Sequence, residues 1–207
     1  MLNRYARAVT TKLFTPLARL LLRLGLTPDA VTFLGTLGVV ASALVLYPMG
    51  ELFWGSLAVT IFVLSDTIDG IMARSLGRSG KWGAYLDSTL DRFADGAVFG
   101  GLAVWFARGG DDDLTAGLAL LCLVLGSIVS YAKARAEGLG YTANVGIAER
   151  GERMVAVLVG AGFVGLGVPL GFLQVVLALL AVGSAVTVVQ RMTTVHRQAT
   201  AATAPDA

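Results

Sequence analysis

Cysteine, histidine and charged residues are scarce in this sequence. Among 207 residues there is one cysteine, Cys122, and one histidine, His196, and charged residues make up only 14%. A single cysteine excludes an intramolecular disulfide, and a lone histidine is a poor basis for a metal site, because such sites draw on several ligands. Hydrophobic residues make up 56% and the mean hydropathy is +0.74, above the apolar share of about 45–50% of soluble domains. The composition predicts an integral membrane protein, and we expect no nucleic-acid partner.

The hydrophobic runs are long enough to cross a bilayer. A helix needs about 20 apolar residues to span the hydrocarbon core, so a chain of this length accommodates roughly six spans. We place the spans at about 28–47, 52–74, 83–107, 114–134, 153–166 and 170–189. The expected fold is an all-α integral membrane protein with six transmembrane helices, in one domain over residues 26–190.

The two ends of the chain lie outside this domain. In residues 1–25, basic side chains are interspersed with apolar ones at helical spacing, which is typical of an amphipathic helix in the membrane interface. Residues 191–207 are polar and rich in alanine and threonine. We expect them to form a cytoplasmic tail that is largely disordered after Arg197.

The basic residues predict the orientation of the chain. With the spans placed as above, all of the 16 lysines and arginines except Arg108 fall on one side of the membrane. Loops rich in lysine and arginine stay on the cytoplasmic side. We therefore expect a multi-pass protein of the bacterial cytoplasmic membrane, with both termini and the turn at 75–82 facing the cytoplasm.

Four aspartates lie beside this turn. Asp66 and Asp69 are three residues apart, and Asp87 and Asp91 are four apart, so each pair shares one face of its helix. If the two helices pack antiparallel across the turn, the four side chains converge. Carboxylates beside a bilayer are costly unless something compensates them, and convergent oxygen ligands suit Mg²⁺ or Mn²⁺, with four carboxylates favouring two ions. Asp95, one turn after Asp91, is expected to hydrogen-bond a neighbouring helix instead.

The spacing of these residues resembles a known family signature. Residues 66–91 read D-x2-D-G-x2-A-R-x8-G-x3-D-x3-D, the pattern of the CDP-alcohol phosphotransferases. These membrane enzymes move a phosphatidyl-type group from a CDP-linked lipid to an alcohol. The resemblance implies that Asp66, Asp69 and Asp87 are metal ligands, and that Asp91 is both a ligand and the base that accepts the hydroxyl proton. It also implies two Mg²⁺ ions, with Mn²⁺ as an alternative, and a homodimer surrounded by membrane lipids.

The same resemblance implies a binding site for CDP-diacylglycerol. The segment from Pro28 to Thr32 matches a family segment that contacts the CDP moiety, with aspartate at position 29 where asparagine is commoner. A plain helix cap is the alternative interpretation of this segment. The implied CDP-diacylglycerol contacts are Asp29, Ala30, Val31, Thr32, Gly70, Ala73, Arg74, Ser79 and Gly80.

The acceptor alcohol is predicted from four basic residues near one membrane surface. Lys133 and Arg135 at the end of the fourth span, Arg153 at the start of the fifth and Arg191 at the end of the sixth all lie at the cytoplasmic side, where guanidinium groups can bind a phosphate. On charge alone, the ordinary cytoplasmic excess of basic residues is the favoured explanation. The stretches 130–137, 148–153 and 189–195, however, resemble bacterial phosphatidylinositol phosphate synthases, which implies that the acceptor is inositol phosphate.

Two other functions stay open at this stage. Glycerol 3-phosphate also carries a phosphate, so a phosphatidylglycerophosphate synthase, or another CDP-alcohol enzyme with a different acceptor, fits the same basic residues. A cation transporter or a non-enzymatic binding protein would also use acidic residues in a membrane. Transport requires acids near the bilayer midplane with access to both faces, whereas these acids gather at one side.

Overall fold

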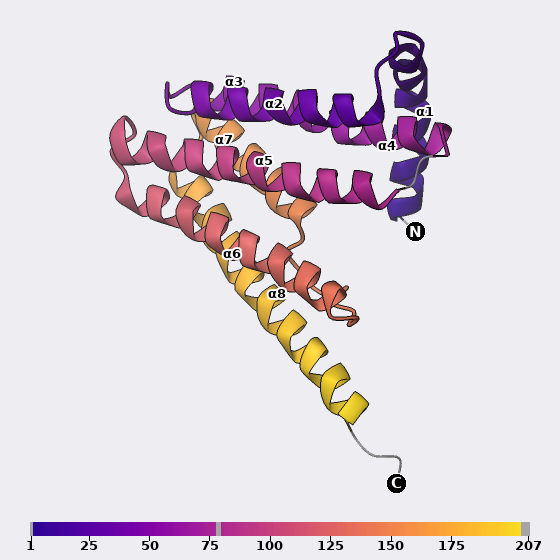
Figure 1. The fold of residues 1–207 in the computed structure, drawn as a ribbon. Helices are drawn as coiled ribbons and strands as arrows, with labels where there is room; N and C mark the ends of the chain where they lie inside the picture. Colours follow the sequence, from indigo (N-terminus) through magenta and orange to yellow (C-terminus); the bar gives the residue numbers. More distant parts are fainter. Residues whose placement is uncertain (1, 78–79, 204–207) are drawn as a thin grey trace.

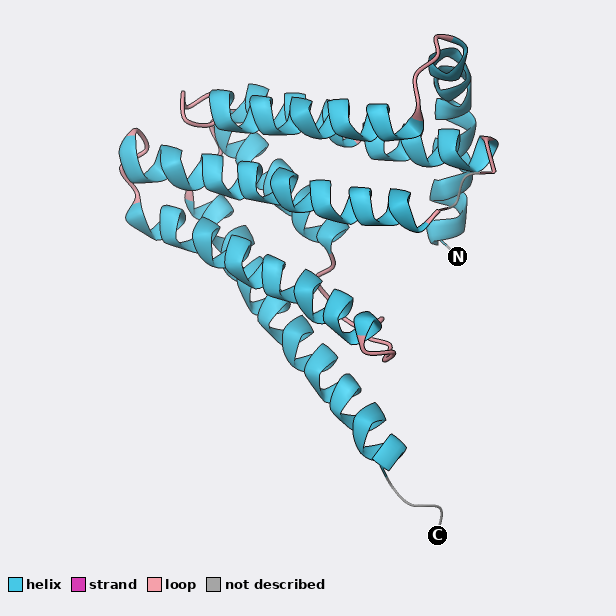
Figure 2. Ribbon diagram, viewed as in Figure 1, coloured by secondary structure: helices cyan, strands magenta, loops and turns pink. Residues whose placement is uncertain are grey.

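Helices make up all of the regular secondary structure in the described part of the chain. The structure is a computed structural model that describes residues 2–77 and 80–203, and Figure 2 shows helices joined by short loops. In chain order the helices are α1 Leu2–Arg23, α2 Pro28–Leu46, α3 Leu52–Val63, α4 Ser65–Ser75, α5 Lys81–Arg108, α6 Asp113–Gly138, α7 Arg150–Gly165 and α8 Gly171–Thr203.

The helices from α2 onward form a bundle, and α1 crosses one end of it. Helix α2 packs on α3, α4 and α5, helix α6 packs on α5 and α8, and α7 packs on α3 and α8. Helix α1 contacts α4 and lies across the direction of the bundle helices (Figure 1). This placement fits the expected interfacial helix at the N-terminus. The C-terminal part of α8 extends away from the rest of the bundle in the same figure.

Four stretches of helix are long and apolar enough to cross a membrane. They are Pro28–Leu46, Leu52–Ser75, Asp113–Gly138 and Gly171–Ala201. Helix α5 carries Asp87, Asp91, Arg92 and Asp95 within its length, and α7 has only 16 residues. Neither is among the four candidate spans, α5 because of its charged residues and α7 because it is too short. The all-helical membrane fold is therefore confirmed in its class, with four candidate spans.

The core lies where α2, α3, α5, α6, α7 and α8 meet. Helix α2 begins at Pro28, and the Thr27 hydroxyl accepts a hydrogen bond from the Ala30 N–H, which satisfies one of the unpaired donors of the first turn. Small residues then allow close packing, because a Cβ atom at Gly101 of α5 would lie 2.6 Å from the Ala43 carbonyl oxygen of α2. Many leucines, valines and phenylalanines on the outer faces remain exposed, as expected for surfaces that contact lipid.

The span expected at 52–74 is divided into two helices. Helix α3 ends at Val63 and α4 begins at Ser65. At this break the Ser65 hydroxyl donates to the Phe62 carbonyl, and a Cβ atom at Gly35 of α2 would collide with the Ser65 side chain. The break therefore lies where Gly35 of α2 leaves no room for a Cβ atom beside Ser65, and α4 begins one residue before the first aspartate.

The C-terminal helix is longer than the sequence indicated. Disorder was expected after Arg197, whereas α8 continues to Thr203. The Gln198 side chain accepts a hydrogen bond from the Thr142 N–H and donates one to the Thr142 carbonyl. Alanine also favours helix more than any other residue, and alanines recur after Arg197. Contacts with the loop after α6 and local propensity together account for the extra helical turns.

Candidate active site

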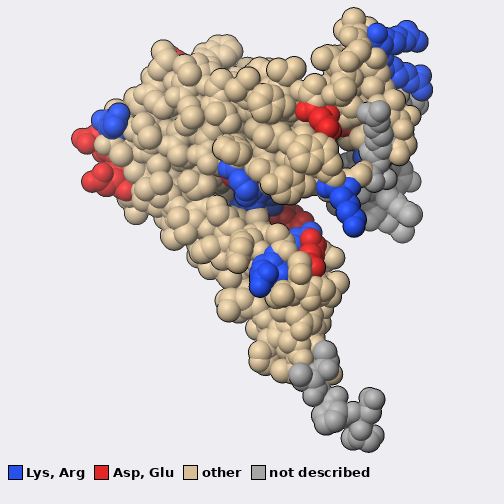
Figure 3. Space-filling model, in the orientation of Figure 1, with Lys and Arg blue, Asp and Glu red and all other residues tan. Residues whose placement is uncertain are grey.

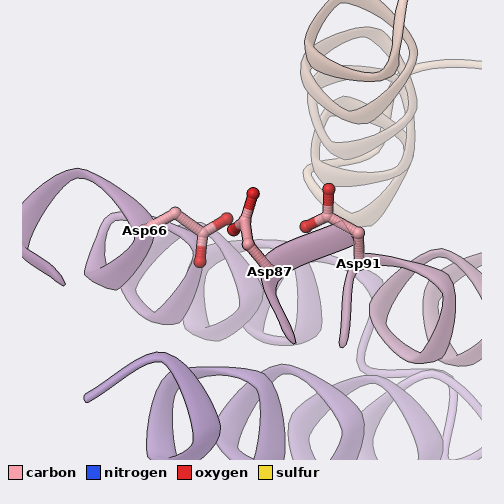
Figure 4. Close-up of side chains that lie close together, drawn as sticks. All are labelled: Asp66, Asp87 and Asp91. Carbon is pink, nitrogen blue, oxygen red and sulfur yellow. The ribbon is translucent and has the colours of Figure 1, made fainter. Parts of the chain in front are cut away.

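Three aspartates from two helices converge at the end of the bundle near α1. Carboxylate oxygens of Asp66 on α4 and of Asp87 and Asp91 on α5 lie within 4.8 Å of one another. Figure 4 shows the Asp66 and Asp87 carboxylates facing each other, with Asp91 next along α5. Asp87 is exposed, and the other two are half-buried. Three carboxylate oxygens this close are a donor set that fits a divalent cation with oxygen preference.

Asp69 does not join this group of three. Its side chain is buried, and its Oδ2 atom accepts a hydrogen bond from the Thr32 hydroxyl of α2. Thr32 also donates to the Pro28 carbonyl one turn earlier in α2. The fourth carboxylate of the signature thus joins α4 to Thr32 near the start of α2, in the implied nucleotide segment.

Arg150, the first residue of α7, contacts two of the three carboxylates. Its Nη1 atom lies 2.7 Å from Asp91 Oδ1 and 3.5 Å from Asp66 Oδ2. Its Nε atom donates a hydrogen bond of 3.2 Å to Asp95 Oδ1. The expectation that Asp95 bonds a neighbouring helix is confirmed by this contact. The sequence interpretation gave Arg150 no role, although its stretch, with Glu149, Glu152 and Arg153 beside it, is the densest run of charge between two spans.

A cavity of about 750 Å³ opens beside the carboxylates. Its lining side chains come from α5, α6, α7, α8 and the end of the loop before α7: Ala84, Ser88, Asp91, Arg92, Ser127, Val129, Ser130, Tyr131, Lys133, Ala134, Glu137, Glu149, Arg150, Arg153 and Arg191. Five of these residues are basic and three are acidic. Figure 3 shows basic and acidic side chains gathered in the hollow between the upper helices and α6 and α8. The cavity therefore favours an anionic ligand.

Two arginines in the cavity wall are almost fully buried. Arg153 Nη1 donates to the Ala148 carbonyl at 2.9 Å, and Arg191 donates to the Val145 and Val129 carbonyls at 2.9 and 2.6 Å. Only 1% of Arg153 and 3% of Arg191 is exposed. Because a buried guanidinium needs compensation, these backbone acceptors hold each group in place at the wall of the cavity.

The structure brings together three of the four basic residues named for the acceptor. Lys133 lines the cavity together with Arg153 and Arg191, whereas Arg135 is exposed and does not. Residues two apart on a helix point in nearly opposite directions, so α6 cannot present both Lys133 and Arg135 to the same cavity. The assignment of Arg135 to this pocket is therefore not supported by the geometry.

The residues named for CDP-diacylglycerol lie around the first turn of α2 and the end of α4. Asp29 is exposed and accepts a hydrogen bond from the Trp82 indole. Gly70 lies beside the Arg74 guanidinium, since a Cβ atom there would be 3.3 Å from Nη1. The remaining residues are Ala30, Val31 and Thr32 in α2, Ala73 in α4 and Gly80 before α5. Ser79 lies outside the described residues.

Comparison with known proteins gives consistent matches along most of the chain. The family model for CDP-alcohol phosphatidyltransferase matches residues 25–195. A phosphatidylinositol phosphate synthase of Streptomyces avermitilis is 54% identical over 213 residues, covering 100% of this chain and 87% of that protein. A protein of the same name from Mycobacterium marinum is 51% identical over 193 residues, covering 92% of this chain and 82% of that protein.

Solved structures are similar in fold as well. The crystal structure of Mycobacterium tuberculosis phosphatidylinositol phosphate synthase with CDP-DAG bound has a TM-score of 0.85 at 49% identity, covering 89% of this chain and 94% of that one. The structure of that protein in complex with manganese and citrate has a TM-score of 0.82 at 49% identity, covering 88% of each chain. The similarity thus extends over the bundle that carries the three carboxylates and the cavity.

Proposed function

The chain belongs to the CDP-alcohol phosphatidyltransferase family, and we propose that it is a phosphatidylinositol phosphate synthase. In the proposed reaction CDP-diacylglycerol and 1D-myo-inositol 3-phosphate give a phosphatidylinositol phosphate and CMP. One observation carries the proposal: the carboxylate group and the arginine-lined cavity are adjacent, since Asp91 belongs to both and Arg150 of the cavity contacts two of the carboxylates. The CDP-DAG complex of a protein 49% identical to this one supports the donor substrate.

We assign the metal site to the carboxylates of the signature. Asp66, Asp87 and Asp91 would hold divalent ions through their converging oxygens, with Asp69 as a further ligand from α4. We propose two Mg²⁺ ions, with Mn²⁺ as an alternative that the manganese complex of the similar structure supports. When bound, such ions neutralise a pyrophosphate and stabilise a leaving phosphate.

The chain's own residues orient the acceptor and take its proton. Lys133, Arg153 and Arg191 would bind the inositol phosphate group, since these three basic residues, from α6, α7 and α8, line the same cavity. An inositol hydroxyl then attacks the phosphorus that bears diacylglycerol, and the bond between this phosphorus and the oxygen that leaves with CMP breaks. Asp91, at the junction of cavity and carboxylates, accepts the hydroxyl proton. Transfer of this kind needs mainly positioning and charge stabilisation from the protein.

The donor lipid would lie across the first turn of α2 and the end of α4. The Asp69–Thr32 hydrogen bond supports this placement, because it fixes the nucleotide segment of α2 to the helix that carries Asp66. Arg74, beside Gly70, would pair with a phosphate of the CDP group, and Gly80 would lie over it. The apolar outer faces would leave the acyl chains in the bilayer.

We further propose the membrane arrangement expected from the sequence. Six spans are formed by α2, α3 with α4, α5, α6, α7 and α8, and α1 lies in the interface. Arg74, Lys81, Lys133, Arg153 and other basic residues belong to the end of the bundle that holds the cavity. By the positive-inside rule that end, with both termini, faces the cytoplasm. A homodimer is proposed by family resemblance, and cross-linking in membranes tests it.

The direct test is CMP release by the purified protein in detergent. The assay contains CDP-diacylglycerol and Mg²⁺, with 1D-myo-inositol 3-phosphate, free inositol or glycerol 3-phosphate added separately. Release only with inositol 3-phosphate is the expected result. Release with glycerol 3-phosphate instead would keep the carboxylate chemistry and overturn the acceptor, whereas no release from folded protein with any acceptor would overturn the proposed enzyme function.

A further inference from the structure

Arg150 differs from the other cavity arginines in the partners that hold it. The guanidinium groups of Arg153 and Arg191 donate mainly to backbone carbonyls, which stay in place when a ligand enters. Arg150 Nη1 instead lies between Asp91 Oδ1 and Asp66 Oδ2, at 2.7 and 3.5 Å. These are oxygens of two of the three carboxylates that converge beside the N-terminal part of α5. The position of Nη1 therefore depends on the charge of that carboxylate group.

A divalent cation and this guanidinium compete for the same oxygens. Each N–H···O contact of Arg150 uses a carboxylate lone pair that a metal ion would also use, and the two positive charges repel at short distance. When a cation binds Asp66 and Asp91, it neutralises the charge that attracts Nη1. The contacts of Nη1 with the two aspartates must then weaken.

A second contact keeps the displaced guanidinium at the cavity. Arg150 Nε donates to Asp95 Oδ1 at 3.2 Å, and Asp95 is buried, with 6% of its surface exposed. Arg153 Nη2 lies 3.7 Å from the other Asp95 oxygen. Asp95 therefore contacts both arginines, one at each carboxylate oxygen. Because the guanidinium is planar and rigid, a tilt about the Nε–Asp95 contact moves Nη1 only a short way, so Arg150 stays among the residues that line the cavity.

We propose that Arg150 is a positioning residue that couples metal binding to binding of the acceptor phosphate. Its Nη1 donor passes from Asp91 and Asp66 to a phosphate oxygen of the acceptor as the divalent cation binds, while Nε stays on Asp95. The identity of the acceptor rests on the proposed function. Because coupling between two ligands is reciprocal, the acceptor phosphate must raise the affinity for the metal by the same factor.

The test uses the full-length protein in detergent and a glutamine in place of the arginine. Binding of Mn²⁺ is followed from the electron paramagnetic resonance signal of the free ion, without substrates. In Arg150→Gln the competing donor is gone, so we expect Mn²⁺ to bind about tenfold more tightly, the weight of one charge-assisted hydrogen bond. Arg135→Gln, which removes an exposed charge outside the cavity, should leave Mn²⁺ affinity as in the wild type.

The coupling itself is measured by calorimetry with 1D-myo-inositol 3-phosphate. Its affinity is determined with and without Mn²⁺ in the wild type, Arg150→Gln and Arg150→Lys. The gain on adding Mn²⁺ should fall by about tenfold in Arg150→Gln. Lysine keeps the charge but cannot hold Asp95 and reach the phosphate at once, so Arg150→Lys should show nearly wild-type Mn²⁺ affinity and the same loss of coupling.

Clear results would overturn the inference. If folded Arg150→Gln binds Mn²⁺ no more tightly than the wild type, the arginine does not compete with the metal. If the gain on adding Mn²⁺ survives in both variants, Arg150 does not transfer its donor to the phosphate. Failure of the proposed function is seen separately, as absence of CMP release by the wild type with inositol 3-phosphate, and the Mn²⁺ titration does not depend on that outcome.

Discussion

The close contact between α2 and α5 makes Gly101→Ala a sharp test of the packing that positions the carboxylates. A Cβ atom at this position would lie 2.6 Å from the Ala43 carbonyl oxygen and 3.2 Å from its carbonyl carbon. The neighbouring atoms are backbone, so no side-chain rotation can relieve the overlap. Helix α5 has to move away from α2 by about 0.8 Å to restore an ordinary contact of 3.4 Å.

The expected cost follows from two opposing effects. Forcing extra volume into a packed interior costs about 1–3 kcal/mol, and a clash with backbone lies at the upper end of that range. Alanine is more favourable than glycine in a helix by up to about 1 kcal/mol. The net loss in the free energy of unfolding is therefore about 2 kcal/mol, which for a chain of this size lowers Tm by about 4–8 °C.

The single cysteine provides the assay. Cys122 is fully buried between α6 and α8, where its thiol contacts the Leu177 carbonyl at 3.1 Å. A thiol-reactive fluorogenic dye can label it only when the helices separate, so the fluorescence of the purified protein during heating reports unfolding from one known place. The same assay applies to every variant that keeps Cys122.

Gly117→Ala is the matched control. Gly117 lies on the exposed face of α6, and a Cβ atom there meets nothing within 4 Å. The same substitution then gives only the helix-propensity gain, and Tm should rise by about 2–4 °C. If Gly101→Ala is as stable as the wild type, or is stabilised like the control, then α2 and α5 are not in the close contact described here.

Three further predictions concern the site and one concerns stability at low pH. Asp91→Asn should abolish CMP release while Tm stays within a few degrees of the wild type, and full activity would refute Asp91 as the base. Thr32→Val removes the hydroxyl that donates to Asp69, so KM for CDP-diacylglycerol should rise severalfold with kcat less affected; an unchanged KM would separate this contact from donor binding. Treatment with EDTA should stop CMP release and added Mn²⁺ should restore it, whereas activity that survives chelation would refute the metal site. Hydrogen bonds from Thr115 hold the pKa of Asp112 below its usual value, so the contribution of this carboxylate to stability is present above about pH 4 and is lost as the pH falls through the folded pKa. Circular dichroism melts should show Asp112→Asn less stable than the wild type at neutral pH and equal to it at the lowest pH. The same difference in Tm at both pH values would contradict the reasoning.

The sequence predicted the helical class and three members of the carboxylate group because both depend on local spacing. Asp87 and Asp91 share a face by their separation of four residues, and both lie close to Asp66 of α4. Asp69 has the same local pattern. Its different partner could not be predicted, because the Thr32 hydroxyl reaches it from a helix 37 residues away in the sequence.

For the basic residues, charge and membrane side did not predict which side chains line the cavity. Charge and membrane side alone placed Lys133 and Arg135 together, whereas the helical geometry of α6 directs only Lys133 into the cavity. That separation could have been inferred from their spacing of two residues. The role of Arg150 could not, because its contacts with Asp66, Asp91 and Asp95 depend on how the start of α7 lies against α4 and α5.

Helix α5 explains why the carboxylates and the arginines occur together. Asp87, Asp91 and Asp95, on successive turns of a helix that we propose to cross the membrane, are unfavourable unless opposite charge or a metal compensates them. The first residue of α7 supplies part of that compensation through Arg150, and Arg153 one turn later lies 3.7 Å from Asp95. Since a buried charge without a partner is costly, buried Asp95 depends on the arginines of α7 for its place inside the bundle. The two arginines of α7 that stabilise the carboxylates of α5 thus also line the cavity proposed for the acceptor phosphate. The contact between the start of α7 and α5 therefore contributes both to the carboxylate group and to the proposed acceptor site.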